Sequence, residues 1–282
     1  IVGDPRFEEA QRLFGDFHNF DDGRVKIDAA VHAEYTNKAK YCREVAEWSH
    51  LHKLTMQVHV SETKLEHEEC KARNGGLTPV EFLLDTGILE AGEGCSATAA
   101  HCVWVTERDI ELLADNNVTV AHNPVSNLKL ASGVAPIAPM LGKGVNVGLG
   151  TDGAASNNKL SVLRELQTAA LIHKGVNYRA DIIPTADFLK MATENGAKAQ
   201  GRLDCGRIEA DYRADLLLFD LDSLNNIPMY DPFSTLAFSA EPCDVSLTMC
   251  DGKVLFENGE FTTIDVEKLK FRAKETIAHY FD

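Results

Sequence analysis

The 282-residue sequence is poor in positive charge and lacks any long hydrophobic run. Its 28 lysines and arginines are outnumbered by 43 aspartates and glutamates, which gives a formal net charge of −15 and a pI of about 5.1. A chain this acidic disfavours nucleic acid or an anionic membrane as its main partner. No apolar stretch approaches the roughly 18 residues of a transmembrane helix, and the first residues lack the basic start and apolar stretch of a signal peptide. We therefore expect a cytoplasmic protein with no membrane or nucleic-acid partner.

The cysteines form no CxxC pair, and their number, seven, is odd. This pattern is typical of free thiols in a reducing compartment and does not support a cysteine-rich zinc site. We expect reduced and mostly buried side chains at Cys42, Cys70, Cys95, Cys102, Cys205, Cys243 and Cys250.

Short apolar runs alternate with amphipathic stretches between about residues 25 and 200. This alternation is typical of βα units around a parallel sheet. The predicted strands are 24–32, 54–62, 96–102, 117–123 and 144–152, and the longer predicted helices are 35–53, 161–174 and 185–200. Thr78 and Glu81 form a capping-box pattern with Pro79 at the first helical position, and Thr106 with Asp109 begins another helix in the same way.

The pattern changes after about residue 203, where short strand-like segments are separated by Asp-Gly and Asn-Gly turns. We predict a partial βα barrel over 1–202, a β-rich appendage over 203–262 and a terminal helix over 263–282. A complete (β/α)₈ barrel has eight strands in typically ~250 residues, and this sequence predicts only five such strands. Because residue 1 is also isoleucine and not methionine, we expect further barrel units upstream.

Ionisable residues stand at the carboxyl ends of all five predicted strands: His32, His59, His101, His122 and Asp152. In a parallel barrel these ends meet on one face, where active sites form. A single histidine of this kind is more often structural, but five ionisable groups so placed indicate a site. We expect the other six of the ten histidines to be surface or structural residues.

Two of these ends can be examined by strand parity. In 144–152 the apolar residues 145, 147 and 149 share one face, which leaves small residues and Asp152 on the other. A carboxylate at a barrel rim must be paired, hydrogen-bonded or bound to a metal, because burying it alone is costly. In "QVHVSETK" (57–64), His59 shares a face with Ser61, so Glu62 fits only if the strand has ended before it.

The segments "HVSET", "AAHCVW", "AHNPVSNLKLASG" and "GLGTDGAASNN", in this order, resemble the amidohydrolase superfamily. The resemblance runs from about residue 4 to 260 and is greatest to 5′-methylthioadenosine/S-adenosylhomocysteine deaminases and their chlorohydrolase-like relatives. It implies an α/β fold, a (β/α)₈ TIM-type metal-dependent hydrolase barrel that is incomplete at the N-terminus in this sequence. It also implies that the C-terminal β-rich region is part of a small β-sandwich.

By this resemblance, His59 and Asp152 are ligands of one divalent transition metal, commonly zinc, although iron and manganese accept the same ligand types. His101 resembles the histidine that contacts the metal-bound water and moves protons with Asp152. Glu62 resembles the glutamate that contacts the purine and donates a proton to its ring nitrogen.

Two further residues are implied to contact substrate. His32, in "VHAEYT", resembles a substrate-binding histidine of the fourth barrel strand. Arg6, in "PRFEEAQRLF", resembles an arginine that meets a substrate carboxylate.

The family's HxH metal pair has no counterpart at a strand end. His50 and His52 have the spacing but lie in the helix predicted over 35–53. Side chains at i and i+2 of a helix point about 200° apart, so the two cannot bind one ion from the same face. We expect the missing N-terminal segment to supply the pair, and the 282 residues alone to be inactive.

The predicted function is hydrolytic deamination of an adenosine derivative, at a carbon–nitrogen bond other than a peptide bond, with release of ammonia. The partner is then a small purine nucleoside. Guanine deamination and triazine chlorohydrolysis on the same scaffold are alternatives, and so is an inactive fragment or non-catalytic scaffold. An apolar flank left open by missing barrel units would favour association, so a homo-oligomer is compatible with the sequence.

Overall fold

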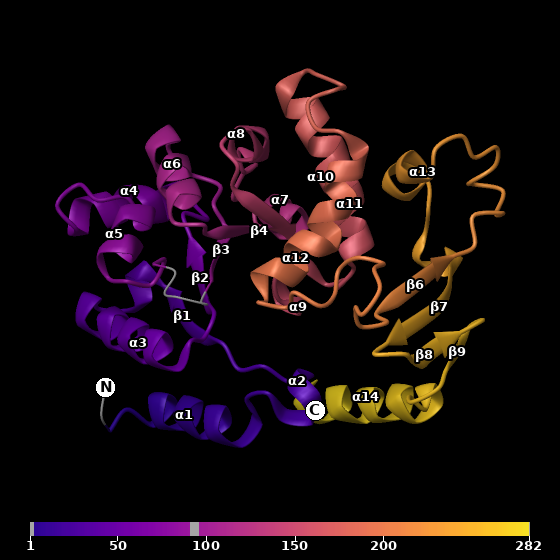
Figure 1. Cartoon of the computed structure of the whole chain (residues 1–282), viewed down its shortest axis with the longest axis horizontal. Helices are drawn as coiled ribbons and strands as arrows, with labels where there is room; N and C mark the ends of the chain where they lie inside the picture. Colours follow the sequence, from indigo (N-terminus) through magenta and orange to yellow (C-terminus); the bar gives the residue numbers. More distant parts are fainter. Residues whose placement is uncertain (1–2, 91–95, 282) are drawn as a thin grey trace. The chain divides into compact units, whose positions relative to one another are not determined.

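A computed structural model describes residues 3–90 and 96–281. The chain divides into two compact units, Ile1–Leu203 and Asp204–Asp282, and each contains a sheet of its own (Figure 1). The domain boundaries expected at residues 202/203 and 262/263 stay predictions. Cys95 lies outside the described residues.

The first unit is built on a five-stranded parallel sheet in the order β1-β2-β3-β4-β5. All five predicted strands are present but shorter than expected. Their bounds are Ala29–Ala33 (β1), Met56–Val60 (β2), Ala97–His101 (β3), Thr119–His122 (β4) and Asn146–Leu149 (β5). Parallel pairing of strands that follow one another in the chain brings their carboxyl ends to one edge of the sheet.

One row of side chains crosses this sheet from β2 to β5. Val58 pairs with Ala99, Ala99 with Val120, and Val120 with Val147. All four are at most 3% exposed. Burial of each valine contributes about 1.5–3 kcal/mol, so this row fixes the register of the sheet.

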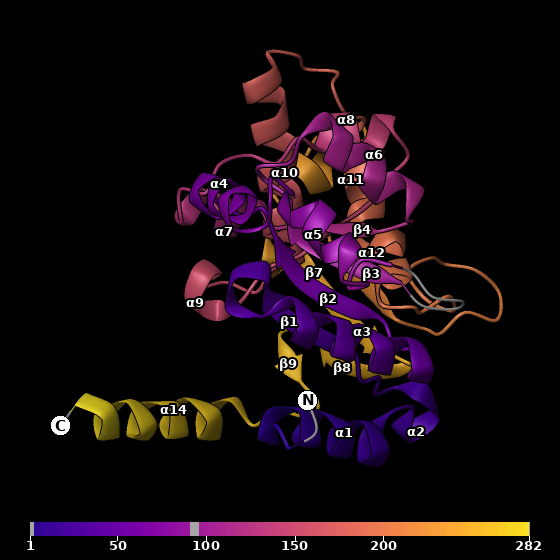
Figure 2. The ribbon, with the colours of Figure 1, turned by 90° about the vertical axis from the view of Figure 1, so that its left-hand side faces the viewer.

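Helices follow the strands, as the βα pattern predicts, and α3 lies alongside β1 (Figure 2). The capping boxes predicted at Thr78 and Thr106 are present, and Thr63 with Glu66 forms another. The helical elements of this unit are Pro5–Phe17 (α1), Phe20–Gly23 (α2), Glu34–Thr36 (η1), Ala39–His52 (α3), Lys64–Arg73 (α4), Pro79–Asp85 (α5), Glu107–Asp115 (α6), Pro124–Lys129 (α7), Ile137–Gly142 (α8), Ala154–Asn157 (α9), Val162–Asn177 (α10), Thr185–Ala192 (α11) and Glu194–Ala199 (α12).

The prediction of one helix over 185–200 is wrong. The backbone leaves the helical region at Thr193 (φ −131°, ψ −98°), which separates α11 from α12. This break places Asn195 against β5, where its Nδ2 donates to Val147 O at 2.8 Å. A backbone carbonyl of the sheet is thereby satisfied, which a continuous helix would not achieve in this way.

The second unit contains an antiparallel sheet in the order β6-β7-β8-β9. Its strands are Leu216–Phe219 (β6), Val245–Cys250 (β7), Lys253–Glu257 (β8) and Glu260–Phe261 (β9). The stretch between β6 and β7, expected to be irregular, contains α13 (Pro232–Phe238) and the short η2 (Pro242–Asp244), and α14 (Val266–Phe281) follows the sheet.

Fewer of the described cysteines are buried than predicted. Cys42, Cys70 and Cys102 of the first unit are buried, whereas Cys243 and Cys250 of the second are exposed. None of the helices among residues 3–90 and 96–281 combines the length and the apolarity needed to cross a membrane.

Candidate functional site

Three predicted residues meet at the carboxyl ends of β2, β3 and β5. The ligand atoms of His59, His101 and Asp152 all lie within 4.8 Å of one another. The cluster thus brings His101 together with the two residues expected to bind a metal. Two imidazoles and a carboxylate are the donor types of catalytic zinc sites.

His59 is oriented by the neighbouring strand. Its Nδ1 donates to the carbonyl oxygen of His32 at 2.7 Å, and β1 is paired there through Ala33 and His59. Because a neutral histidine has one N–H, this bond leaves Nε2 as the ligand atom. β2 ends at Val60, so Glu62 lies in the following loop, as the parity argument requires.

His101 enters the site through an unusual backbone turn. It ends β3 with φ +74°, in the left-handed region, which redirects its side chain from the face that Ala97 and Ala99 occupy. Such a conformation costs about 1–3 kcal/mol in a residue other than glycine. The ring is 1% exposed, and its Nδ1 lies 2.8 Å from Asn127 Oδ1. Its Nε2 is buried with no hydrogen-bond partner among the described residues.

Asp152 is held as a carboxylate by hydrogen bonds. Ser126 and Ser156 donate their hydroxyls to Oδ2 at 2.6 and 2.7 Å, and the backbone N–H of Gly153 donates to Oδ1 at 2.7 Å. Burial alone raises the pKa of Asp152, but these bonds and the nearby His101 outweigh it and lower the pKa below its usual value. β5 ends at Leu149 and Asp152 has φ +58°, so simple strand parity does not extend to it.

Glu62 lies beside His101. Its Oε2 is 3.8 Å from His101 Nε2, and its Oε1 accepts a hydrogen bond of 3.2 Å from the hydroxyl of Ser132. The loop that carries Glu62 is fixed by Glu66, whose carboxylate accepts from the backbone N–H groups of Ser61 (2.8 Å) and Glu62 (2.7 Å). Glu62 is therefore held next to the three-residue cluster from two directions.

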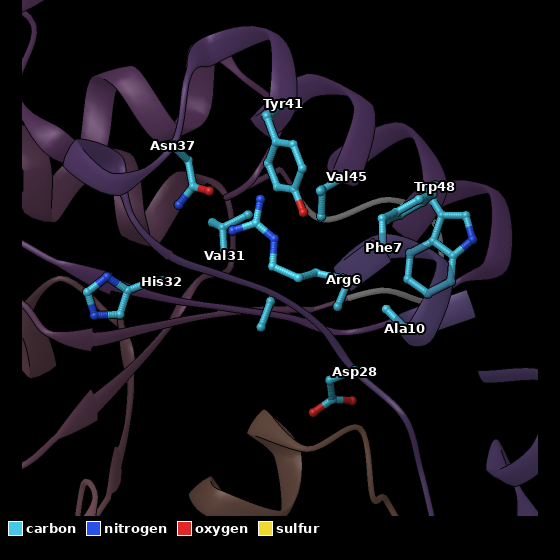
Figure 3. A pocket seen from close by; sticks show the side chains of 12 residues that line it. Arg6, Phe7, Ala10, Asp28, Val31, His32, Asn37, Tyr41, Val45 and Trp48 are labelled. Atoms are coloured by element: carbon cyan, nitrogen blue, oxygen red, sulfur yellow. The ribbon is translucent and has the colours of Figure 1, made fainter. Parts of the chain in front are cut away.

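His32 connects this cluster with a cavity of about 260 Å³ between α1, β1 and α3. In Figure 3, Arg6 extends from α1 into the cavity toward Tyr41, and His32 stands at its other side. Asp4 binds Nη2 of Arg6 at 2.8 Å and Nε at 3.1 Å, while the Arg6 side chain remains 83% exposed. The two predicted substrate-binding residues thus line the same cavity. Their roles stay predictions.

His122, at the end of β4, does not join the cluster. Its Nε2 lies 3.0 Å from Nε2 of His173 in α10, and both side chains are 1% exposed. His122 shares its strand face with the buried Val120, so its side chain leaves the site by parity. His173, one of the histidines expected to be structural, is its partner.

His50 and His52 both lie in α3, as predicted. His50 Nε2 is bonded to Glu90 O at 3.0 Å, whereas the ring of His52 packs against Phe14 and Trp48. They share no candidate metal cluster within the part of the chain that the structure describes.

Sequence reasoning left four contributors unassigned: Ser126, Asn127, Ser132 and Glu66. The first three lie in "AHNPVSNLKLASG", one of the segments that carry the family resemblance. The fourth completes a T-x-x-E capping box after "VHVSE". These patterns are present in the sequence. Ser126, Asn127 and Ser132, however, each bond a residue more than twenty positions away along the chain.

The chain belongs to the amidohydrolase family, whose pattern its residues 2–255 match. Among curated proteins, it is 40% identical over 275 residues to the 5-methylthioadenosine/S-adenosylhomocysteine deaminase of Thermoanaerobacter pseudethanolicus, covering 97% of this chain and 63% of the relative. It is also 40% identical over 267 residues to the 5′-deoxyadenosine deaminase of Methanosarcina acetivorans, covering 95% of this chain and 60% of that protein.

Solved structures with the same fold include two with zinc. The adenosine deaminase of Xanthomonas campestris with bound zinc superimposes with a TM-score of 0.90 at 32% identity, covering 95% of this chain and 60% of that one. The atrazine chlorohydrolase of Arthrobacter aurescens complexed with zinc gives a TM-score of 0.88 at 26% identity, covering 95% and 58%. The chain therefore spans about three fifths of the length of the relatives it matches.

Proposed function

We propose that this chain forms the catalytic part of a metal-dependent hydrolase that deaminates an adenosine derivative of the S-adenosylhomocysteine or 5′-methylthioadenosine type. The observation that carries the proposal is the placement of Glu62 against His101, Oε2 to Nε2 3.8 Å, beside the candidate metal ligands. The identity of about 40% to two kinds of adenosine-derivative deaminase supports the substrate class. We propose that this chain contributes five strands to a (β/α)₈ barrel that is completed by residues beyond these 282.

The residues present fit a divalent metal. His59 Nδ1 is hydrogen-bonded, which leaves its Nε2 available to a metal. Asp152 is held in its ionised form. His101 Nε2 is buried without a hydrogen-bond partner among the described residues. His59 and Asp152 would bind the ion, and zinc is favoured by the two zinc-containing structural neighbours. A divalent metal in such a site supplies a water whose pKa is lowered toward ~7.

Proton transfer is assigned to three side chains. His101 Nε2 and the Asp152 carboxylate take the proton that the attacking water loses as its oxygen bonds to C6 of the adenine ring. The Glu62 carboxyl donates a proton to N1 of the ring, so negative charge does not build up on that nitrogen. The proton taken up by His101 and Asp152 passes to the amino group, the C6–N bond breaks and ammonia leaves. The C6 hydroxyl returns its proton to Glu62, and an inosine-type product remains.

Substrate positioning is assigned to His32 and Arg6. Both line the cavity beside the cluster (Figure 3), and the guanidinium of Arg6 suits the carboxylate that S-adenosylhomocysteine carries. Methylthioadenosine lacks this carboxylate. Replacement of Arg6 by methionine should therefore raise KM for the first substrate at least 10-fold and leave KM for the second nearly unchanged.

A second candidate function is supported by the chlorohydrolase neighbour, because the same cluster would activate water toward any electron-poor aromatic ring. A substrate panel separates the two. The product of the complete reading frame, loaded with zinc, should release ammonia from S-adenosylhomocysteine or methylthioadenosine. Ammonia from guanine alone, or chloride from a chlorotriazine without any deamination, would overturn the assignment. No turnover of any substrate by a zinc-loaded protein would favour a non-catalytic scaffold.

A further inference from the structure

We infer that Asn127 is a positioning residue that fixes the tautomer of His101, with the proton on Nδ1 and the lone pair on Nε2. Its neighbour Ser126, on the same short helix α7, holds the carboxylate of Asp152. The two adjacent residues thus orient both of the groups that are assigned to take a proton from water. The catalytic consequence rests on the proposed function, whereas the tautomer itself does not.

The contact between Asn127 and His101 is buried on both sides. Each residue is 1% exposed, and Asn127 Oδ1 lies 2.8 Å from His101 Nδ1. An amide oxygen can only accept, so Nδ1 must donate. A neutral imidazole has one N–H, which leaves Nε2 as an acceptor. Nε2 is the atom that is buried without a partner among the described residues and lies 3.8 Å from Glu62.

Two asparagine amides face the same ring nitrogen at different distances. Asn127 Oδ1 lies 2.8 Å from His101 Nδ1, an ordinary length for an N–H···O hydrogen bond, whereas Asn123 Nδ2 lies 3.4 Å from it. The shorter contact is to an oxygen, which can only accept, so Nδ1–H donates to Asn127. The amide nitrogen of Asn123 is itself a donor, so its longer contact is not a hydrogen bond in this tautomer.

The helix α7 is anchored independently of the site. The buried carboxylate of Glu165 accepts from the backbone N–H of Val125 at 3.0 Å and from Asn157 Nδ2 at 2.7 Å. Lys129, at the other end of α7, donates to Ala155 O at 2.8 Å. Consecutive residues on a helix point about 100° apart. Ser126 and Asn127 can therefore reach Asp152 and His101, which come from two different strand ends.

Loss of the Asn127 oxygen should change the tautomer. In water a neutral histidine favours the proton on Nε2, and the hydrogen bond at the other nitrogen decides which form a protein selects. Without an acceptor at Nδ1, the Nε2–H form should become populated. This form presents a donor where the proposed reaction needs an acceptor.

The test is ¹⁵N NMR of the imidazole of His101 in the metal-free chain at pH 8, which distinguishes a protonated from an unprotonated ring nitrogen. We expect Nδ1–H in the wild type and in Asn127→Asp, which keeps an acceptor. Asn127→Leu should shift a large fraction to Nε2–H. Ser126→Ala, a change of the adjacent residue, should leave the His101 tautomer as in the wild type.

An Nε2–H tautomer in the wild type would overturn the inference, and this result needs no variant to fold. An unchanged tautomer in Asn127→Leu, with the wild-type circular dichroism spectrum, would also overturn it. Because no substrate or metal enters the experiment, its failure is distinguishable from failure of the substrate panel.

Discussion

His122 and His173 face each other through their Nε2 atoms at 3.0 Å, with both rings withdrawn from solvent. Such a contact needs one ring to donate and the other to accept, so at most one ring can be charged, and burial favours the neutral form of both. Burial lowers the pKa of His173 to about 4, and burial together with the positive charges of His173 and His101 lowers the pKa of His122 well below its usual value.

The pair should make the first unit less stable in mild acid. In the unfolded chain both histidines titrate near 6.5. Between that pH and about 4 the unfolded state binds more protons than the folded state, so the free energy of unfolding falls as the pH falls. Each such group contributes about 1.4 kcal/mol per pH unit in this window. Urea unfolding at pH 7.5 and pH 5 should differ by about 2–4 kcal/mol.

The matched variant is His173→Gln, which can still donate to His122 but does not titrate. Its stability should depend less on pH between 5 and 7 than that of the wild type. If the wild type were equally stable at pH 7.5 and pH 5, the two rings could not be a neutral pair.

Glu66 should contribute more to the free energy of unfolding than the exposed glutamates of α4 do. Its carboxylate accepts from the backbone N–H groups of Ser61, Glu62 and Thr63 at 2.8, 2.7 and 3.4 Å. Glu66→Ala removes an N-terminal cap and leaves buried donors without a partner, so it should cost about 2–3 kcal/mol. Glu69→Ala is the control, since Glu69 is exposed and bonds Arg73 at the surface. Its expected cost is below about 1 kcal/mol. Equal losses in the two variants, measured by urea unfolding, would show that Glu66 does not hold the loop.

Asp152 should be required for metal binding, whereas the histidines of α3 should not. Asp152→Asn removes the charge that Ser126, Ser156 and Gly153 stabilise, and it should weaken zinc binding at least 10-fold. His52→Gln changes a histidine that packs between Phe14 and Trp48, so its zinc affinity should match the wild type. Equilibrium dialysis with zinc measures both. A loss in His52→Gln as large as that in Asp152→Asn would move the metal site to another part of the molecule.

The sequence predicts the parallel sheet well because βα patterning is local. Hydrophobic runs and capping boxes each depend on neighbours within a few residues, and the helix starts at Pro79 and Glu107 are where those patterns place them. The break at Thr193 escaped prediction because its cause is distant: Asn195 bonds a carbonyl of β5.

The candidate site also has a part that local sequence predicts and a part that it does not. His59 and Glu62 could be placed by strand parity, because β2 ends at Val60. His122 occupies an equivalent strand end and yet turns to His173, a residue of a helix that begins forty residues later. His101 reaches the cluster only through its left-handed backbone, which no residue pattern indicates. Strand ends predict which residues are near the site, whereas strand parity and backbone turns decide which of them enter it.

The most direct test of the deaminase proposal is turnover by Glu62→Gln in the product of the complete reading frame. Ammonia release from S-adenosylhomocysteine and bound zinc should be measured on the same samples of wild type and variant. Glu62 is assigned to proton donation and not to metal binding, so the variant should keep its zinc and lose about 10²–10⁴-fold in kcat. Wild-type turnover by a zinc-loaded Glu62→Gln protein would contradict the account.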